Sequence, residues 1–215
     1  MGFLSVLSLA QRWAAERLEP GAAAVDATAG GGVDTLFLAR ACGPKGRVYA
    51  FDVQRDAVNR TRERLAAAAR DSESGSGNGS IARRASGGGS APPSLAPVEL
   101  LLAGHERMAE LVAPEHRGRI RAVMFNLGYL PGEGGDRSIV TRPETTVAAL
   151  EAALGLLAPK GIVTAVLYPG HEGGDIEAAA VEAWAAALPS VLAQSVQYRF
   201  PQKPSAPYLI AVSKR

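Results

Sequence analysis

The sequence predicts an α/β fold: a doubly wound, mostly parallel sheet with one antiparallel strand at its edge. Three observations lead to this prediction. Short apolar runs alternate with segments of helical periodicity, a glycine-rich turn follows the first apolar run, and two strand-like runs close the chain with no helix between them. Alternating strands and helices form parallel sheets with right-handed crossovers. Two strands joined directly run antiparallel, so the closing pair supplies the reversed strand.

The bulk composition is that of one soluble globular domain. The 215 residues are 47% hydrophobic and 20% charged, and the formal net charge is +2. This charge is well below that of a dedicated nucleic-acid-binding surface, so it decides little about partners. Cys42 is the single cysteine, which excludes an internal disulfide and favours a reduced, cytoplasmic setting. We expect neither a signal peptide nor a membrane span.

The first third of the chain predicts an opening helix followed by a βαβ unit. Apolar residues at helical spacing over 3–18 give the helix, and Glu19-Pro20-Gly21 ends it. A strand over 22–25 then runs into a turn that ends in three glycines, 30–32. The remaining expected elements of the unit are a helix over 33–41, a strand over 47–51 that ends at Asp52, and a helix over 57–69.

The middle and the end of the chain repeat the same alternation after an interruption. From about 71 to 97 the composition shifts to Ser, Gly, Asn and Pro, which predicts a flexible insertion. The elements expected beyond it are strands over 98–102, 120–125 and 162–167, helices over 106–112, 142–157 and 175–188, and a final strand pair over 191–198 and 208–212. Trp184 is expected to face inward.

The glycine turn and its neighbours predict a ligand site. In an open α/β sheet, ligands bind outside the carboxyl ends of the strands, which brings the segment 26–34, Asp52 and Asn126 to one crevice. Gly30 and Gly32 let the backbone turn tightly and approach an adenosine-type ligand. A glycine turn alone is a weak signal, since it also serves as a tight connection without a ligand.

Asp52, which ends the second strand, supports the ligand hypothesis. A carboxylate at this position can accept hydrogen bonds from both hydroxyls of a ribose. The alternative is that Asp52 caps the helix that begins near Arg55. Both roles remain open at this point.

The polar groups of the turn favour S-adenosylmethionine over NAD. The sequence lacks the G-x-G-x-x-G spacing of a dinucleotide site and instead carries Asp26, Thr28 and Asp34 beside the glycines. Carboxylates suit the charged ammonium group of a methionine moiety, whereas they would repel an anionic pyrophosphate.

The end of the fourth strand predicts a methyl-transfer site. Residues 126–131 read Asn-Leu-Gly-Tyr-Leu-Pro and resemble the Asn-Pro-Pro-Tyr corner of methyltransferases that act on nitrogen. Asn126 Oδ1, together with the Leu127 or Gly128 carbonyl, can orient an attacking nitrogen. Tyr129 can stack on a flat base, although core packing is an equally good explanation. Asn126 and Tyr129 are therefore the predicted catalytic residues.

Two histidines follow strands at the same edge of the sheet. His105 comes after the third strand and His171 after the fifth, and either can assist proton removal or serve as a structural hydrogen-bond partner. The sequence contains no phosphate-binding loop with Lys-Ser or Lys-Thr, no His-Glu-x-x-His and no cysteine cluster. No metal is expected.

Taken together, five segments resemble one family of class I S-adenosylmethionine-dependent methyltransferases, the rRNA methylase family. They are Asp-Ala-Thr-Ala-Gly-x-Gly-x-Asp-Thr-Leu-Phe-Leu-Ala over 26–39, Phe-Asp-Val-Gln over 51–54, Gly-His-Glu over 104–106, Phe-Asn-Leu-Gly-Tyr-Leu-Pro-Gly over 125–132, and Tyr-Pro-Gly-His over 168–171. The likeness covers nearly the whole chain outside the insertion. Characterised bacterial members methylate the aminomethyl group of the tRNA wobble uridine.

The resemblance implies a Rossmann-like fold, S-adenosylmethionine as cofactor, tRNA as substrate with rRNA as the alternative, and a homodimer. It also implies which side chains surround the two ligands. The cofactor residues are Asp26, Thr28, Gly30, Gly32, Asp34, Thr35, Asp52, Gln54, His105 and Asn126, and the substrate residues are Tyr129, Tyr168 and His171. The sequence departs from the family at Gly31, where Asn is usual, and at Val33, where His or Tyr is usual.

Three functions are compatible with these observations. An RNA N-methyltransferase is favoured by the Asn126 corner and by the resemblance. A cofactor- or RNA-binding protein that no longer catalyses is the alternative raised by Gly31 and Val33. An NAD-linked oxidoreductase rests only on the βαβ unit and Asp52.

Overall fold

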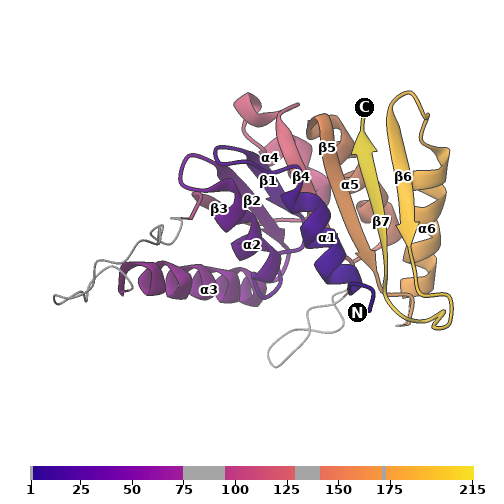
Figure 1. Ribbon diagram of the computed structural model, residues 1–215, viewed down its shortest axis with the longest axis horizontal. Coiled ribbons are helices and arrows are strands. Elements are labelled where there is room, and N and C mark those ends of the chain that lie inside the picture. Colours follow the sequence, from indigo (N-terminus) through magenta and orange to yellow (C-terminus); the bar gives the residue numbers. More distant parts are fainter. Residues whose placement is uncertain (1, 75–94, 129–140, 171–172) are drawn as a thin grey trace.

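The computed structural model describes residues 2–74, 95–128, 141–170 and 173–215. Seven strands form a single sheet with the order β3-β2-β1-β4-β5-β7-β6, and helices cover both of its faces (Figure 1). The strands are β1 (Ala23–Asp26), β2 (Arg47–Asp52), β3 (Val98–Leu102), β4 (Ile120–Asn126), β5 (Leu157–Leu167), β6 (Ala193–Tyr198) and β7 (Tyr208–Lys214). The α-helices are α1 (Val6–Ala15), α2 (Val33–Cys42), α3 (Arg55–Ser74), α4 (Met108–Leu111), α5 (Pro143–Leu156) and α6 (Gly174–Ala187).

The sheet is parallel from β3 to β5, and β7 is its reversed strand. β7 pairs antiparallel with β5 on one side and with the outermost strand β6 on the other. The predicted mostly parallel sheet with an antiparallel strand at one edge is therefore confirmed. The reversed strand lies one place inside that edge.

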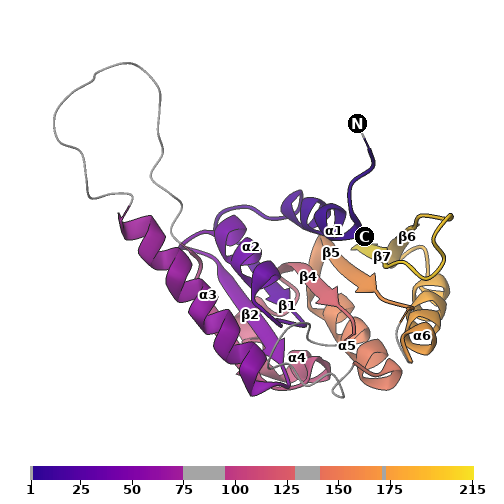
Figure 2. The same cartoon turned by 90° about the horizontal axis from the view of Figure 1, so that it is seen from below.

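Strand alternation divides the core between the two faces. Along β1 and β4, Val25 and Phe125 pack into the cluster under α4, α5 and α6, while Ala24 and Met124 pack into the cluster under α1 and α2. Successive side chains of a strand point to opposite faces, so a strand buried on both sides reads as a continuous apolar run. Figure 2 shows the two helical layers.

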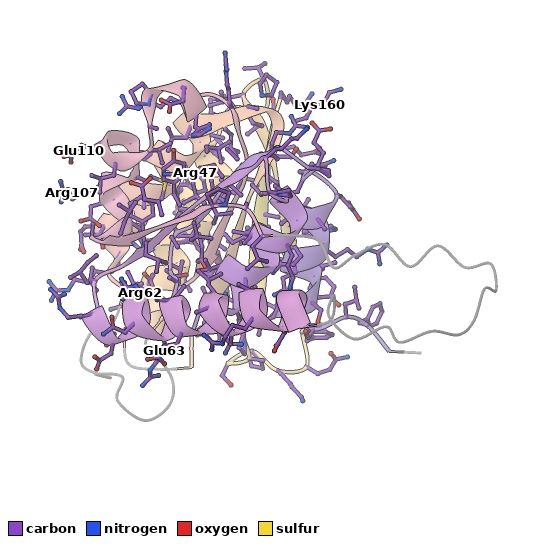
Figure 3. All side chains as sticks on the ribbon, turned by 90° about the vertical axis from the view of Figure 1, so that its left-hand side faces the viewer. Arg47, Arg62, Glu63, Arg107, Glu110 and Lys160 are labelled. Carbon is purple, nitrogen blue, oxygen red and sulfur yellow. The ribbon has the colours of Figure 1, made fainter. Side chains whose placement is uncertain are left out.

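Helix α3 is longer than the sequence predicts and runs along the β3 edge of the molecule. Its outer face carries exposed charges such as Arg62 and Glu63 (Figure 3). Residues 71–74 continue this helix, and Ala96, at the other end of the expected insertion, is 3% exposed and donates its N–H to Ala39 O at 2.9 Å. The part of the insertion between 75 and 94 lies outside the described residues.

Two further elements differ from the prediction. The helix expected over 106–112 is a 3-10 turn (His105–Arg107) followed by the single turn of α4. β5 begins earlier than expected, at Leu157, because Pro159-Lys160-Gly161 forms an irregularity within the strand instead of ending it. Lys160 there has a φ of 65°, and a residue in this conformation bends a strand without breaking its pairing on either side.

The topology fixes where a ligand binds. From β1 the chain proceeds to β2 and β3 on one side and returns to β4 and β5 on the other. The crevice of an open α/β sheet lies at this switch point, outside the carboxyl ends of the strands. Asp26 and Asn126 end the two strands that flank it.

Candidate functional site

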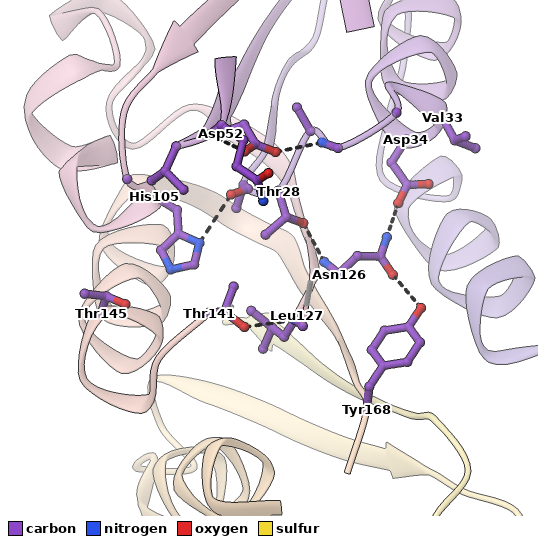
Figure 4. A pocket seen from close by; sticks show the side chains of 18 of the residues that line it. Thr28, Val33, Asp34, Asp52, His105, Asn126, Leu127, Thr141, Thr145 and Tyr168 are labelled. Atoms are coloured by element: carbon purple, nitrogen blue, oxygen red, sulfur yellow. Dashed lines mark hydrogen bonds between the residues drawn. The ribbon is translucent and has the colours of Figure 1, made fainter. Parts of the chain in front are cut away.

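A cavity of about 1040 Å³ lies at this switch point. Its volume is at the upper end of the roughly 300–1,000 Å³ typical of small-molecule sites. The wall is built from the β1–α2 turn, the ends of β2 to β5, helices α1 and α5 and the β6–β7 connection. Figure 4 shows that side chains from these separate elements meet around one space. The predicted convergence at the crevice is confirmed.

Two glycines shape the turn above the cavity. Gly30 and Gly32 have φ values of 53° and 75°, which L side chains rarely adopt. Gly32 also lies against α3, where an added Cβ would come within 2.9 Å of Thr61 Cα. The turn therefore packs directly on α3, and the Thr61 hydroxyl donates to Gly30 O at 3.2 Å. By contrast, a Cβ at Gly31 would meet nothing within 4 Å.

A set of polar residues ties the turn to the end of β1, and we call Asp26, Thr28 and Thr35 the rear cluster, although Thr28 also lines the cavity. Asp26 is 1% exposed. It accepts hydrogen bonds from the Thr35 hydroxyl at 2.6 Å and from Thr28 N at 3.1 Å. Burial, together with the charge of Asp34, raises the pKa of Asp26 to about 7. The carboxyl group thus ties the end of β1 to the first turn of α2.

A second group faces the cavity, and we call Gln11, Asp34, Asn126 and Tyr168 the front cluster. Asp34 accepts from Gln11 Nε2 at 2.7 Å and also from Asn126 Nδ2. The Tyr168 hydroxyl lies 3.4 Å from Asn126 Oδ1, toward which it donates (Figure 4). Burial raises the pKa of both Asp34 and Tyr168.

The front cluster fixes which way the Asn126 amide points. A carboxylate oxygen only accepts, so the group facing Asp34 must be the amide nitrogen. Oδ1 of Asn126 is then turned toward Tyr168 and the cavity. Thr28 joins the two clusters, because its hydroxyl accepts from Asn126 N at 2.7 Å while its own N–H binds Asp26.

Asp52 lines the cavity at the end of β2 and holds two backbone groups. Oδ2 accepts from Gly30 N at 2.9 Å, and Oδ1 accepts from Gln54 N at 2.8 Å. The second bond forms an Asx turn with the residue before α3, so Asp52 shapes the approach to the helix, whereas a capping side chain would accept from an N–H inside its first turn. Each carboxylate oxygen has a further lone pair, and these are available to a ligand in the cavity. Burial raises the pKa of Asp52.

His105 is a neutral side chain in the wall between β1 and α5. It is 7% exposed, and burial lowers its pKa. Nδ1 lies 3.3 Å from Ala27 O, and a carbonyl only accepts, so this nitrogen carries the proton. Nε2 is consequently an acceptor. The ring packs edge-on against Phe125, with 5.6 Å between the ring centroids.

The charges around the cavity are mainly negative. Among the described residues that line it, Asp34, Asp52 and Glu106 are carboxylates and Arg142 is the cation. Carboxylates raise the affinity for a cationic ligand and oppose a pyrophosphate. The residues present therefore fit a nucleoside that carries a positive charge.

The predicted site residues fall into three groups. Those that line the cavity are Thr28, Gly30, Asp34, Asp52, Gln54, His105, Asn126 and Tyr168. Asp26, Gly32 and Thr35 lie behind its wall, where they hold the turn. Tyr129 and His171 lie outside the described residues, so their predicted roles stay predictions.

Sequence reasoning missed several residues that the fold brings to the site. Gln11 reaches Asp34 from α1, and Thr141 and Arg142 line the cavity before α5. Gln11 carries no local signal, since a polar residue in an amphipathic helix normally faces water. The Thr-Arg-Pro run over 141–143 did offer one, because a proline at the first helical position marks a helix start.

The described residues contain neither a candidate metal site nor a candidate membrane-spanning helix. No group of three or more His, Cys, Asp or Glu side chains in those ranges is placed to hold a metal ion. No helix within them has both the length and the apolar character needed to cross a membrane.

Comparison with known proteins gives one family. A family model described as "Putative rRNA methylase" matches residues 48–214. The chloroplastic tRNA (mnm(5)s(2)U34)-methyltransferase of Arabidopsis thaliana is 36% identical over 203 residues, and the match covers 92% of this chain. It covers 65% of that relative, so the chain spans less than two thirds of the relative's length.

Two solved structures match over their full length. The first, titled a putative rRNA-methylase from Clostridium thermocellum, is 30% identical with a TM-score of 0.82, and all of both chains is covered. The second, SMU.1697c, a putative methyltransferase from Streptococcus mutans in complex with SAH, is 28% identical with a TM-score of 0.74 and the same coverage. The fold is that of the class I methyltransferases, and the chain belongs to the rRNA methylase family.

Proposed function

We propose that this chain is an S-adenosylmethionine-dependent RNA N-methyltransferase that methylates the aminomethyl group of the tRNA wobble uridine. The observation that carries the proposal is the orientation of Asn126, whose Oδ1 faces an acidic cavity at the end of β4 while Asp34 holds its Nδ2. The substrate class is supported by the curated relative from Arabidopsis thaliana, which is named for this modified uridine.

The cavity offers a separate group to each part of the cofactor. Asp52 has the lone pairs to accept two ribose hydroxyls, and Asp34 supplies the negative charge for the methionine ammonium group. The glycine turn lets the backbone approach a ligand closely. His105 and Gln54 line the same cavity as Asp52 and are further predicted cofactor contacts. When bound, the cofactor supplies a methyl group on a positively charged sulfur.

Asn126 orients the attacking nitrogen. A primary amine attacks only when it is neutral, with its lone pair aimed at the methyl carbon. Asn126 Oδ1 accepts an N–H of that amine and so fixes the direction of the lone pair. Tyr168 lies on the same oxygen at 3.4 Å, a long hydrogen bond that a substrate amine replaces at low cost. Tyr129 remains the predicted second catalytic residue, and His171 a predicted substrate contact.

Nucleoside mass spectrometry tests the proposal directly. The purified protein is incubated with S-adenosylmethionine and tRNA from a strain that lacks the modification. We expect the wobble nucleoside to gain one methyl group, and the Asn126→Ala variant to lose most of this methylation while its cofactor affinity changes much less. Unchanged tRNA nucleosides would contradict the proposal, and methylation of ribosomal RNA in a parallel reaction would move the activity to the second substrate class.

The alternatives make different predictions for binding. A protein that binds without catalysis would take up S-adenosylmethionine in calorimetry and show no turnover on any RNA. An NAD-linked oxidoreductase would bind NADH instead, but the three carboxylates that line the cavity oppose a pyrophosphate. Tight NADH binding without binding of S-adenosylmethionine would establish the oxidoreductase.

The resemblance also leads us to propose a single methyltransferase domain that forms a homodimer in the cytoplasm. The buried free thiol of Cys42 suits a reducing compartment. Light scattering on the purified protein measures the mass of the assembly, for which twice the chain mass of 22.3 kDa is expected. A monomeric mass would remove the homodimer from the proposal.

A further inference from the structure

A buried carboxylate outside the cavity is connected to its wall. Glu177, in the first turn of α6, is 3% exposed. Oε2 accepts from the Thr141 hydroxyl at 2.7 Å, and Oε1 accepts from the Thr146 hydroxyl at 2.6 Å. Among the described residues no Lys, Arg or His lies within ion-pair distance of it. The two hydroxyls and the N-terminal end of α6 therefore compensate the buried charge.

Thr141 links Glu177 by hydrogen bonds to Gly128, two positions after Asn126. A hydroxyl has one proton, which Thr141 gives to Glu177, so the oxygen's lone pairs are left to accept. Gly128 N donates to this oxygen at 2.9 Å, and Thr141 N donates back to Gly128 O at 3.0 Å. Gly128 has a φ of 144°, outside the range of ordinary L residues. The two bonds thus hold Gly128 in a backbone conformation that L residues rarely adopt.

The three residues at the end of β4 are each held by a different element. Asn126 N donates to the Thr28 hydroxyl at 2.7 Å, and Leu127 N donates to Val166 O at 2.9 Å. Gly128 N is the third, and it depends on Thr141 and Glu177. Leu127, Gly128 and Thr141 all line the cavity (Figure 4 labels Leu127 and Thr141). Gly128 is two positions after Asn126. A shift of Gly128 would therefore move the backbone close to the Asn126 amide.

We infer that Glu177 is a positioning residue of the methyl-transfer site, which it serves by orienting the Thr141 hydroxyl that fixes Gly128. The inference rests on the proposed function for its kinetic consequence. The hydrogen-bonded chain itself can be tested without any activity.

Thr146 provides a matched control. Its hydroxyl binds the same carboxylate as that of Thr141, but Thr146 is 0% exposed and is not part of the cavity wall. Thr146→Val and Thr141→Val each remove one donor from Glu177. If these contacts only stabilised the fold, Thr146→Val would be at least as harmful, because its hydroxyl is the more deeply buried.

Two measurements on the full-length protein test the inference. Amide exchange by NMR should show Gly128 N–H exchanging at least tenfold faster in Thr141→Val than in the wild type and in Thr146→Val. In methylation assays Thr141→Val should lose roughly tenfold or more in kcat with unchanged affinity for S-adenosylhomocysteine, and Thr141→Ser should restore it. Glu177→Gln, which keeps one acceptor oxygen, should fall between the wild type and Thr141→Val.

The outcomes distinguish the positioning role of Glu177 from the proposed methyltransferase function. Equal losses of kcat in Thr141→Val and Thr146→Val, or an unchanged exchange rate at Gly128 in Thr141→Val, would overturn the positioning role. A wild-type protein with no activity on RNA would refute the proposed function, and the exchange rate of Gly128 N–H in Glu177→Gln would still decide whether Glu177 positions Gly128.

Discussion

The rear and front clusters share the first turn of α2 and are built from similar groups in different surroundings. In the rear cluster, the Asp26 carboxyl is closed off from the cavity and bound by a hydroxyl and a backbone N–H. In the front cluster, the Asp34 carboxyl is bound by two side-chain amides that belong to distant elements. One carboxyl group therefore builds the turn, whereas the other orients the Asn126 amide at the cavity.

The largest expected effect comes from the front cluster. Asn126→Ala removes the oxygen that orients the substrate nitrogen, so we expect turnover to fall by about 10²-fold or more, as for a misplaced nucleophile. Cofactor affinity and stability should change much less. Single-turnover methylation and calorimetry with S-adenosylhomocysteine measure the two quantities. Near-normal turnover in this variant would mean that the front cluster does not orient the substrate nitrogen.

In the rear cluster, a substitution should reduce stability more than turnover. Asp26→Ala leaves the Thr35 hydroxyl and Thr28 N without their acceptor, which should cost about 2–3 kcal/mol of folding free energy. Urea unfolding measures this loss. Asp26→Asn, which retains an oxygen, should lose less. A variant that unfolds like the wild type but fails to bind the cofactor would show that Asp26 contacts the cofactor and does not merely stabilise the turn.

Asp52 stands between the two cases, because it binds backbone groups and lines the cavity. Asp52→Ala should weaken cofactor binding by about 30-fold, or ~2 kcal/mol, the order expected for a hydrogen bond to a charged group. The stability should fall by less than that, because Gly30 N and Gln54 N lie near water. The contrary result, unchanged affinity with collapsed stability, would leave Asp52 only the structural role of holding Gly30 N and Gln54 N.

The pH dependence of stability gives a further test of the rear cluster. Because the pKa of Asp26 is raised from 3.8 to about 7, the folded protein keeps a proton that the unfolded chain releases above about pH 4. The free energy of unfolding should therefore decline as the pH rises from about 4 to 7, by at most about 1.4 kcal/mol per pH unit, and level off above that.

Asp26→Asn does not titrate, so its unfolding free energy should decline less steeply over the same range. Urea midpoints at pH 5, 6, 7 and 8 for both proteins give the difference in slope. Identical slopes would mean that other buried groups, such as Asp34 and Asp52, carry the pH dependence.

The sequence identified the parts of the site that depend on strand ends. Asp52 and Asn126 follow apolar runs, and in a parallel sheet the ends of such runs meet at one edge. The antiparallel strand β7 was also predicted from a local pattern, two strand-like runs with no helix between them. The early start of β5 was not predicted, because Pro159-Lys160-Gly161 has the composition of a turn. Only the pairing with β4 shows that these residues are an irregular part of the strand.

The contacts that depend on tertiary packing were beyond local reasoning. Gln11 and Glu177 are polar residues in helices, where the periodic pattern predicts a solvent-facing side chain. Both instead bind groups brought in by separate elements, Gln11 to Asp34 and Glu177 to Thr141. A buried polar residue is recognised only when its partner is known, and that partner follows from how the helices pack.

The three glycines of the turn differ in how well each position tolerates substitution. Gly32 has no room for a side chain because Thr61 lies against it, and Gly30 has a backbone conformation that disfavours one. Gly31 has neither constraint, since open space surrounds its missing Cβ. Substitutions can therefore accumulate at this position without loss of the fold. A side chain there would enter the space beside the cavity wall, so position 31 can adjust the affinity for a ligand while its two neighbours preserve the turn.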